Sequence, residues 1–133
     1  GYFSDSPGSQ RSPIPKIEGI FDPPTVGDFI GFATVKAHSG FCRRFDQEMR
    51  AAAPGLKTFV ADFVPIAPPD FLRSDHAPFL LAGFPAVMLT DTSNFRNPNY
   101  HKPTDTIATI DAERFALVVK GLAGAAAAIA DAP

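Results

Sequence analysis

Apolar residues occur in short runs that are separated by polar segments rich in proline and glycine. Residues 26–35 form an apolar run with β-branched and aromatic side chains, which predicts a strand. Residues 56–66 alternate and then become apolar, which predicts a second strand. The nearly continuous apolar run at 85–91 is typical of a strand buried on both faces of a parallel sheet. Three strands are therefore expected.

Helical signals follow the first two predicted strands. Phe41, Phe45 and Met49 recur every four residues, with Ser39 in the place of an N-cap. A second, short helix is expected at 76–83, and either Ser74 or Asp75 can cap it. Residues 68–73, before this short helix, are expected to form a loop.

A third helix is predicted after the last strand. Asp111 is a good N-cap, and Glu113 lies in the first turn, where the helix dipole favours an acid. Apolar residues then recur at helical spacing, so this helix is expected to pack on the sheet. The stripe expected to be buried consists of Phe115, Val118, Val119, Leu122, Ala126 and Ile129.

The expected elements alternate in the order β, α, β, α, β, α. This order is typical of an α/β domain, and it predicts a layered α/β/α arrangement with a mostly parallel sheet. No repeat or linker divides the chain, so residues 1–133 are expected to form a single domain. Residues 1–25 are rich in proline, which lacks an N–H group, and are expected to be extended.

The composition of the chain argues against several classes of function. The net charge is −2 with both signs mixed along the chain, which gives no electrostatic footprint for nucleic acid or for an anionic membrane. No apolar run approaches the roughly 20 residues that span a bilayer, and no signal peptide is visible, so a soluble protein of undetermined compartment is expected. Cys42 is the single cysteine, which excludes an internal disulfide, and its apolar helical setting favours a buried structural thiol.

Three histidines are the main candidates for chemistry. His38 lies at a strand–helix junction, where a solvated imidazole is expected. His76 follows Ser74 and Asp75 at a helix start, which suits either an anion site or simple helix capping, and the sequence leaves both open. His101 lies in a loop after the third strand, between two prolines, and such a loop imidazole suits a zinc ligand. Spacing alone does not decide its role.

Residues 73–111 resemble the M28 family of zinc peptidases. The segment carries S-D-H-x-x-F at 74–79, G-F-P-A at 83–86, T-D-T at 90–92 and Y-H-x-x-x-D-T at 100–106, in the family's order. More weakly, residues 1–10 resemble the segment just after one family strand, and residues 26–32 resemble the next strand. The resemblance implies that this chain is the C-terminal portion of a zinc-exopeptidase-like domain, whose fold is incomplete here.

The resemblance also implies roles for particular side chains. His101 corresponds to the last metal ligand of the family, and Tyr100 beside it would face the substrate pocket. Ser74, Asp75 and His76 would line the same pocket, with a peptide as the substrate. Arg96 is expected to contribute to substrate binding by orienting the loop that carries Tyr100 and His101.

The family's other metal ligands and its general base have no counterpart in these residues. Family members bind two zinc ions through a His, a bridging Asp, a Glu, a second acid and the final His, and a further Glu activates the water. Catalytic zinc needs about three protein ligands, so no catalytic residue and no stable zinc binding are expected of this chain alone. The expected partner is the missing N-terminal half of the domain. An exposed sheet edge also suggests self-association.

Two alternatives remain open at this point. The chain could be a non-catalytic, peptidase-like module for binding or assembly, because a fold does not fix a function. It could also belong to a glutaminyl-cyclase-like transferase, since that family shares the fold and a similar D-H-x-P-F element, which stands here at 75–79.

Overall fold

The computed structural model describes residues 1–63 and 69–131. Within them, the strands are β1 (Ile30–Ala33), β2 (Thr58–Ala61) and β3 (Met88–Thr90), and the α-helices are α1 (Ser39–Ala52), α2 (Ala77–Leu81) and α3 (Ala112–Ala130). Four short 3-10 helices join them: η1 (Lys36–His38), η2 (Pro69–Arg73), η3 (Ser93–Phe95) and η4 (Ile107–Thr109). The predicted alternation of strands and helices is confirmed. The predicted second strand also included 64–66, which lie outside the described residues.

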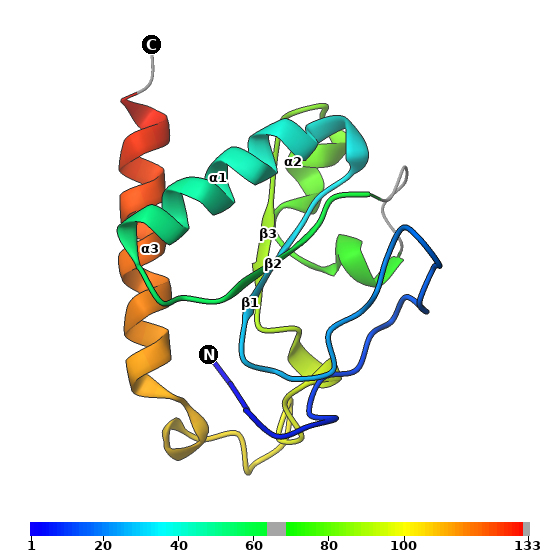
Figure 1. Ribbon diagram of the computed structural model, residues 1–133, viewed down its shortest axis with the longest axis vertical. Helices are drawn as coiled ribbons and strands as arrows, with labels where there is room; N and C mark the ends of the chain where they lie inside the picture. The colour runs from blue at the N-terminus through cyan, green and yellow to red at the C-terminus, as the bar shows by residue number, and fades with distance from the viewer. Residues whose placement is uncertain (64–68, 132–133) are drawn as a thin grey trace.

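The sheet has the order β2-β1-β3, with β1 in the centre (Figure 1). β1 pairs in parallel with β2 and antiparallel with β3, so the predicted mostly parallel sheet is not confirmed. The connection through α1 returns the chain to the end of the sheet where β1 starts, so β2 runs in the same direction as β1. The connection through α2 leads into β3 from the other end of the sheet, so β3 runs in the opposite direction. β3 is half-buried, and the prediction that it is buried on both faces is wrong for the described residues.

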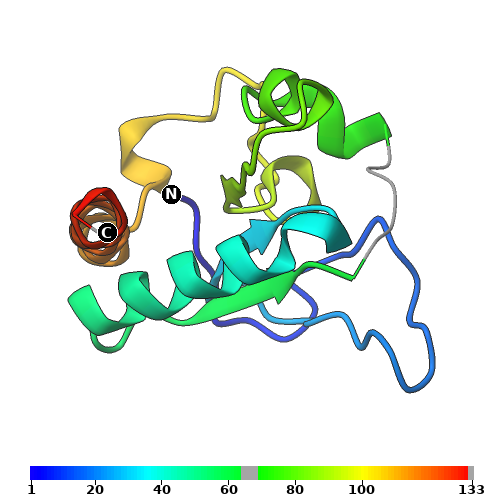
Figure 2. The same cartoon turned by 90° about the horizontal axis from the view of Figure 1, so that it is seen from above.

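α1 and α3 pack closely against each other beside the sheet (Figure 2). The buried residues of α3 are Val118, Gly121 and Ala125. A Cβ atom at Gly121 would lie 2.7 Å from Met49 Cγ, which shows how near the two helix backbones come. A Cβ atom at Gly124 would lie 2.3 Å from the Cβ of Ala52. Small side chains therefore permit the contact.

The predicted buried stripe of α3 is largely wrong. Phe115, Val119 and Leu122 are 45%, 51% and 42% exposed, and Ala126 is exposed as well. Val118 is buried as predicted, and Ile129 is half-buried. α3 is apolar on two adjacent faces, and periodicity cannot tell which of them meets a partner. Within the described residues, no helix combines the length and the apolar character needed to cross a membrane.

The N-cap predicted for α3 is confirmed, whereas those predicted for α1 and α2 are wrong. Asp111 caps α3, since its Oδ1 accepts a hydrogen bond from the Arg114 N–H at 2.9 Å. Ser39 is not the cap of α1; its hydroxyl donates to Asp62 Oδ2 at 2.5 Å, and His38 holds the N-cap position without a side-chain bond. α2 likewise has His76 as its N-cap with no side-chain bond, so neither Ser74 nor Asp75 caps it.

The core lies between β1, α1 and α3. Its largest fully buried side chains include Phe32, Met49 and Cys42. Burial, together with the nearby Asp62 and Asp46 carboxylates, raises the pKa of Cys42 to about 12, and Arg43 opposes this increase. The thiol therefore stays protonated at neutral pH, which confirms its structural setting.

The N-terminal segment is mostly irregular and lies against the chain that follows β3. Isolated bridges join Ser4 to Gly27 and Ile17 to Phe21. The Arg11 N–H donates to the Phe95 carbonyl at 2.9 Å. The contacts of Ser4 and Arg11 join this segment to the residues before β1 and to η3.

Candidate functional site

The loop that carries His101 is closed by its own side chains. We call residues 97–105 the His101 loop. Asn97 is buried, its Nδ2 donates to Asp105 Oδ1 at 3.1 Å, and its Oδ1 accepts from the Asn99 N–H at 2.8 Å. The Lys102 N–H donates to the Asn99 carbonyl at 2.9 Å. This network fixes both ends of the loop and one turn inside it.

His101 stands at the turn of this loop. Its φ of 58° lies in the left-handed region, which non-glycine residues adopt only when the surrounding chain holds them there. Its ring stacks on Tyr100 with the centroids 4.0 Å apart and an angle of 16° between the planes. His101 is exposed and Tyr100 is half-buried. The structure therefore brings these two predicted site residues together and leaves the imidazole accessible.

The Ser74–His76 turn separates into exposed and buried parts. Ser74 and Asp75 are exposed, whereas His76 is 8% exposed. The His76 ring stands edge-on to Phe71, with centroids 4.6 Å apart, and neither ring nitrogen has a hydrogen-bond partner among the described residues. Burial lowers the pKa of His76, against the opposing effect of Asp75, so the imidazole is neutral at pH 7. His76 thus faces inward, and a substrate role for these three residues stays a prediction.

Arg96 lies apart from the His101 side chain and points to the N-terminal segment. Its Nε donates to Gln10 Oε1 at 2.8 Å, and its Nη1 donates to the carbonyls of Phe29 at 2.7 Å and Tyr2 at 3.3 Å. Its guanidinium also lies over the Phe29 ring at 4.4 Å. Burial lowers the pKa of Arg96. Gly27 is needed here, because a Cβ atom on it would lie 2.8 Å from Arg96 Cδ.

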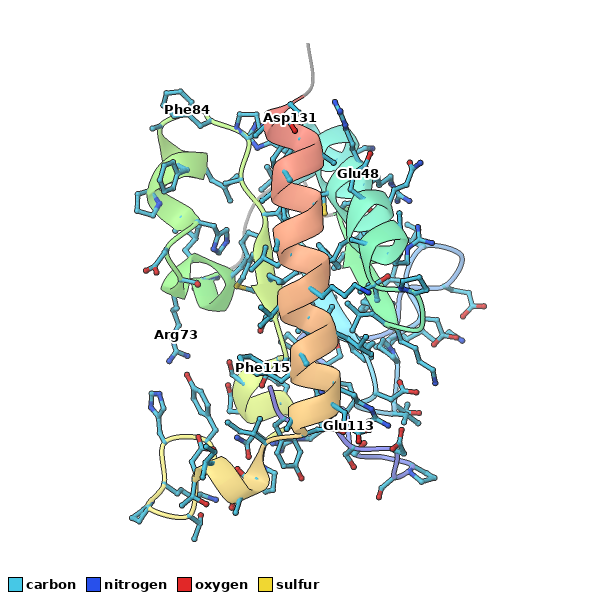
Figure 3. The ribbon with its side chains drawn as sticks, turned by 90° about the vertical axis from the view of Figure 1, so that its left-hand side faces the viewer. Glu48, Arg73, Phe84, Glu113, Phe115 and Asp131 are labelled. Carbon is cyan, nitrogen blue, oxygen red and sulfur yellow. The ribbon has the colours of Figure 1, made fainter. Side chains whose placement is uncertain are left out.

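Two further residues of this region were not singled out by the sequence. Asp91, at the end of β3, accepts hydrogen bonds from the N–H groups of Tyr2 at 2.9 Å and Ser93 at 3.1 Å. Its place in the T-D-T motif was the available signal. Arg73 extends from η2 toward the loop that follows β3 (Figure 3), and only its position at the start of the resembling segment marked it.

The described residues do not by themselves fit a zinc site. Among residues 1–63 and 69–131, no group of three or more His, Cys, Asp or Glu side chains is placed to hold a metal ion. A catalytic zinc ion needs about three protein donors, and His101 offers one. No catalytic step can be assigned to a metal on these residues alone.

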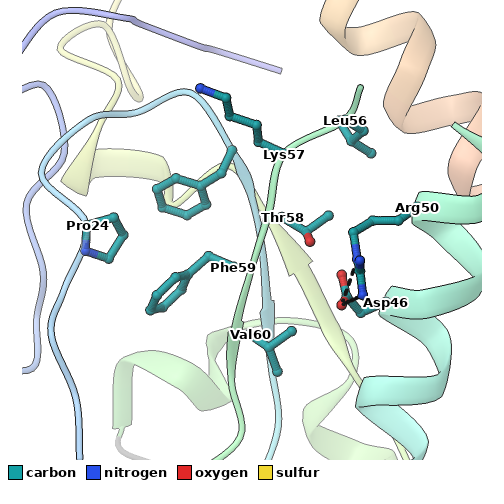
Figure 4. A pocket seen from close by; sticks show the side chains of 9 residues that line it. Pro24, Asp46, Arg50, Leu56, Lys57, Thr58, Phe59 and Val60 are labelled. Atoms are coloured by element: carbon teal, nitrogen blue, oxygen red, sulfur yellow. Dashed lines mark hydrogen bonds and ion pairs between the residues drawn. The ribbon is translucent and has the colours of Figure 1, made fainter. Parts of the chain in front are cut away.

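A hollow lies elsewhere, along β2 (Figure 4). It is an open cavity of about 540 Å³, and it is lined by residues that include Phe59, Lys57 and the Asp46–Arg50 ion pair. No predicted site residue lines it. We attach no chemistry to it, since an open hollow beside an ion pair is ordinary surface.

Comparison with known proteins decides the family. Residues 30–126 match the family described as Peptidase family M28. The chain belongs to this family. The match contains α2, β3 and the His101 loop, so the M28 resemblance of residues 73–111 is confirmed. M28 peptidases are generally zinc-dependent.

One curated relative extends the comparison. The chain is 30% identical over 126 residues to the uncharacterized protein YfbL of Escherichia coli strain K12. The matched region covers 92% of this chain and 36% of YfbL, so the chain spans about a third of the length of this relative. No solved structure matches the chain.

Proposed function

We propose that these residues are the C-terminal part of a zinc-dependent exopeptidase of the aminopeptidase type, which removes N-terminal residues from peptides. The observation that carries the proposal is the Peptidase M28 match over residues 30–126, which includes the His101 loop. In this proposal the chain is inactive without the rest of its peptidase domain, because most metal donors and the general base lie outside it.

The proposal assigns His101 one metal-ligand position. Its support is local: the imidazole is exposed, and the Asn97–Asp105 bond holds the loop on which it stands. A ligand held by a rigid loop needs no rearrangement when the other donors are brought to it. Tyr100, stacked on the same ring, would restrict the rotation of the imidazole.

Asp75 is the proposed contact for the substrate's N-terminus. Its carboxylate is exposed. A peptide N-terminus is an ammonium group, whose charge a carboxylate complements. The partner implied by this proposal is the remaining part of the peptidase domain, and the ligand is a peptide with a free amino end.

The test uses the full-length gene product and the variant His101→Asn. Asparagine tolerates a positive φ, so the substitution removes the imidazole with little change to the backbone. The wild type is expected to release chromophore from aminoacyl nitroanilides and to lose this activity with a chelator. His101→Asn is expected to lower kcat/KM by about 100-fold or more and to reduce bound zinc.

Thr104→Ala is the matched control, since Thr104 is exposed on the same loop. Its activity and zinc content are expected to equal those of the wild type. A His101→Asn variant with full activity and full zinc content would contradict the proposal. Conversion of N-terminal glutamine to pyroglutamate with release of ammonia, without peptide hydrolysis, would favour the cyclase alternative.

A further inference from the structure

The chain turns sharply between β3 and the His101 loop. Thr92 and Ser93 have φ angles of 67° and 49°, so two consecutive non-glycine residues are left-handed. This backbone conformation is unfavourable, above all for a β-branched residue such as Thr92, and it persists only where the surroundings hold it. The turn ends at Arg96, whose N–H donates to the Ser93 carbonyl at 3.1 Å. We call these residues the 92–96 turn.

The buried amide group of Gln10 bonds to both ends of the 92–96 turn. Gln10 is 7% exposed, and its Oε1 accepts from the Thr92 hydroxyl at 2.9 Å and from Arg96 Nε at 2.8 Å. The Thr92 hydroxyl also lies 2.6 Å from the Asp91 carbonyl, so its single proton is shared between two acceptors. Gln10 Nε2 donates to the Arg11 carbonyl at 2.6 Å, which fixes the orientation of the amide. One oxygen atom thus joins the two ends of a strained turn.

The backbone around Gln10 is itself attached to its neighbours. The Gln10 N–H donates to the Thr25 carbonyl at 3.1 Å. The next residue, Arg11, bonds directly to the turn, because its N–H donates to the Phe95 carbonyl at 2.9 Å and its Nη2 donates to the Asn94 carbonyl at 2.8 Å. The Gln10 side chain therefore cannot withdraw from the turn without breaking backbone hydrogen bonds as well.

The His101 loop starts where this turn ends. Asn97, the first residue of the loop, directly follows the turn, and its N–H donates to the Ser93 carbonyl at 2.8 Å. Because the Asn97–Asp105 hydrogen bond closes the loop on itself, the loop is displaced as one piece when the turn changes. The place of the exposed His101 imidazole therefore depends on the conformation of the 92–96 turn.

We propose that Gln10 is a positioning residue for His101. It acts through Thr92 and Arg96, by holding the turn that sets the place of the His101 loop. A displacement of about 1 Å at a reacting group can lower a rate by about 100-fold, so a residue that acts through a turn can still govern activity. The effect of Gln10 on catalysis rests on the peptidase activity proposed above, whereas its effect on the imidazole does not.

The histidine ring signals of the full-length protein, observed by proton–carbon NMR, test this role. The His101 signal is identified by its loss in His101→Asn. The face of the Tyr100 ring shields the imidazole that stacks on it, so a displaced loop moves this signal downfield. Gln10→Met keeps the length of the side chain and removes both bonds to the turn. It is expected to move the His101 signal downfield and to lower kcat/KM by about 10–100-fold.

Two further variants separate position from stability. In Gln10→Glu a carboxylate oxygen still accepts from the Thr92 hydroxyl and from Arg96, so the His101 signal is expected to stay in place and kcat/KM to stay within about 3-fold. The same variant loses the bond to the Arg11 carbonyl, so its Tm is expected to fall. Gln47→Met repeats the methionine substitution at an exposed position of α1 and is expected to change neither the signal nor the activity.

An unchanged His101 signal in Gln10→Met would overturn the proposal, whatever the loss in Tm. An equal change of the signal in Gly124→Ala, which disturbs the contact between α1 and α3, would attribute the effect to lost stability and overturn it too. If Gln10→Met does not fold, Thr92→Val decides, because it removes the hydroxyl and keeps the shape of the side chain. Its His101 signal is expected to move in the same direction, and an unmoved signal overturns the proposal. A wild type that hydrolyses no aminoacyl substrate contradicts the proposed activity, whereas a His101 signal that depends on Gln10 still supports the positioning role.

Discussion

The two apolar faces of α3 differ in the size of their side chains. The face toward α1 is closed and carries Gly121 and Ala125, whereas the outer face is open and carries Phe115 and Leu122. Small residues let two helix backbones approach, and large ones fill the space over a sheet. Side-chain size therefore distinguishes the face that meets a neighbouring helix from the face that is exposed. We call the side of the molecule that carries α1 the closed side and the side that carries β3 the open side.

Arg96 gives the largest expected effect, because it anchors the N-terminal segment on the open side. Arg96→Met removes the side-chain donor of the Tyr2 and Phe29 carbonyls. It also removes one of the two donors to Gln10 Oε1, the other being the Thr92 hydroxyl. We expect the free energy of unfolding to fall by about 3 kcal/mol, and the amides of residues 2–11 to exchange faster. Arg44→Met, at an exposed position of α1, is the control and is expected to stay within about 0.5 kcal/mol. Equal losses from denaturant unfolding would contradict the anchoring role.

Gly124 tests the closed face with a single methyl group. Gly124→Ala puts a Cβ atom 2.3 Å from Ala52 Cβ and forces α1 and α3 apart, at an expected loss of about 2 kcal/mol. Gly40→Ala is the matched change in α1, where no atom lies within 4 Å of the new Cβ. There alanine's helix propensity should add about 0.5–1 kcal/mol. Opposite shifts in Tm are expected, and a rise in Tm from both substitutions would show that the helices are not in close contact at Gly124.

The smallest expected effect concerns His76, beside the open side. Because burial lowers its pKa, the folded chain binds fewer protons at this site than the unfolded chain. Its contribution to stability is therefore complete above the ordinary pKa of 6.5 and is lost as the pH falls below it toward the lowered value. His76→Gln is expected to flatten the decrease in unfolding free energy below pH 6.5. Parallel pH profiles of the wild type and the variant would exclude this role.

Local signals in the sequence predicted the elements well. Asp111 caps α3 as expected, and the three strands and three helices occur in the predicted order among the described residues. The failures concern partners that are distant in the sequence. Ser39 bonds to Asp62, which follows β2, and so does not cap its own helix. The direction of β3 and the exposed face of α3 depend on how distant segments meet, which no periodicity encodes.

The candidate site was predictable where a motif carried it. The Y-H-x-x-x-D-T resemblance located His101, and the structure adds the Asn97–Asp105 bond that holds its loop. The burial of His76 could not be anticipated, because it depends on packing against Phe71 in η2. The inward orientation of Arg96 depends on Gln10 and Tyr2, which lie 86 and 94 residues earlier in the chain.

That separation has a consequence for synthesis on the ribosome. Tyr2 and Gln10 emerge long before Arg96, and at roughly 5–20 residues per second they wait about 5–20 seconds for it. Until Arg96 emerges, Tyr2 and Gln10 lack the guanidinium group to which they bond, and β1 lacks β3 as its neighbour. Completion of this part of the molecule is therefore a late event, set by the time at which residues 88–97 emerge.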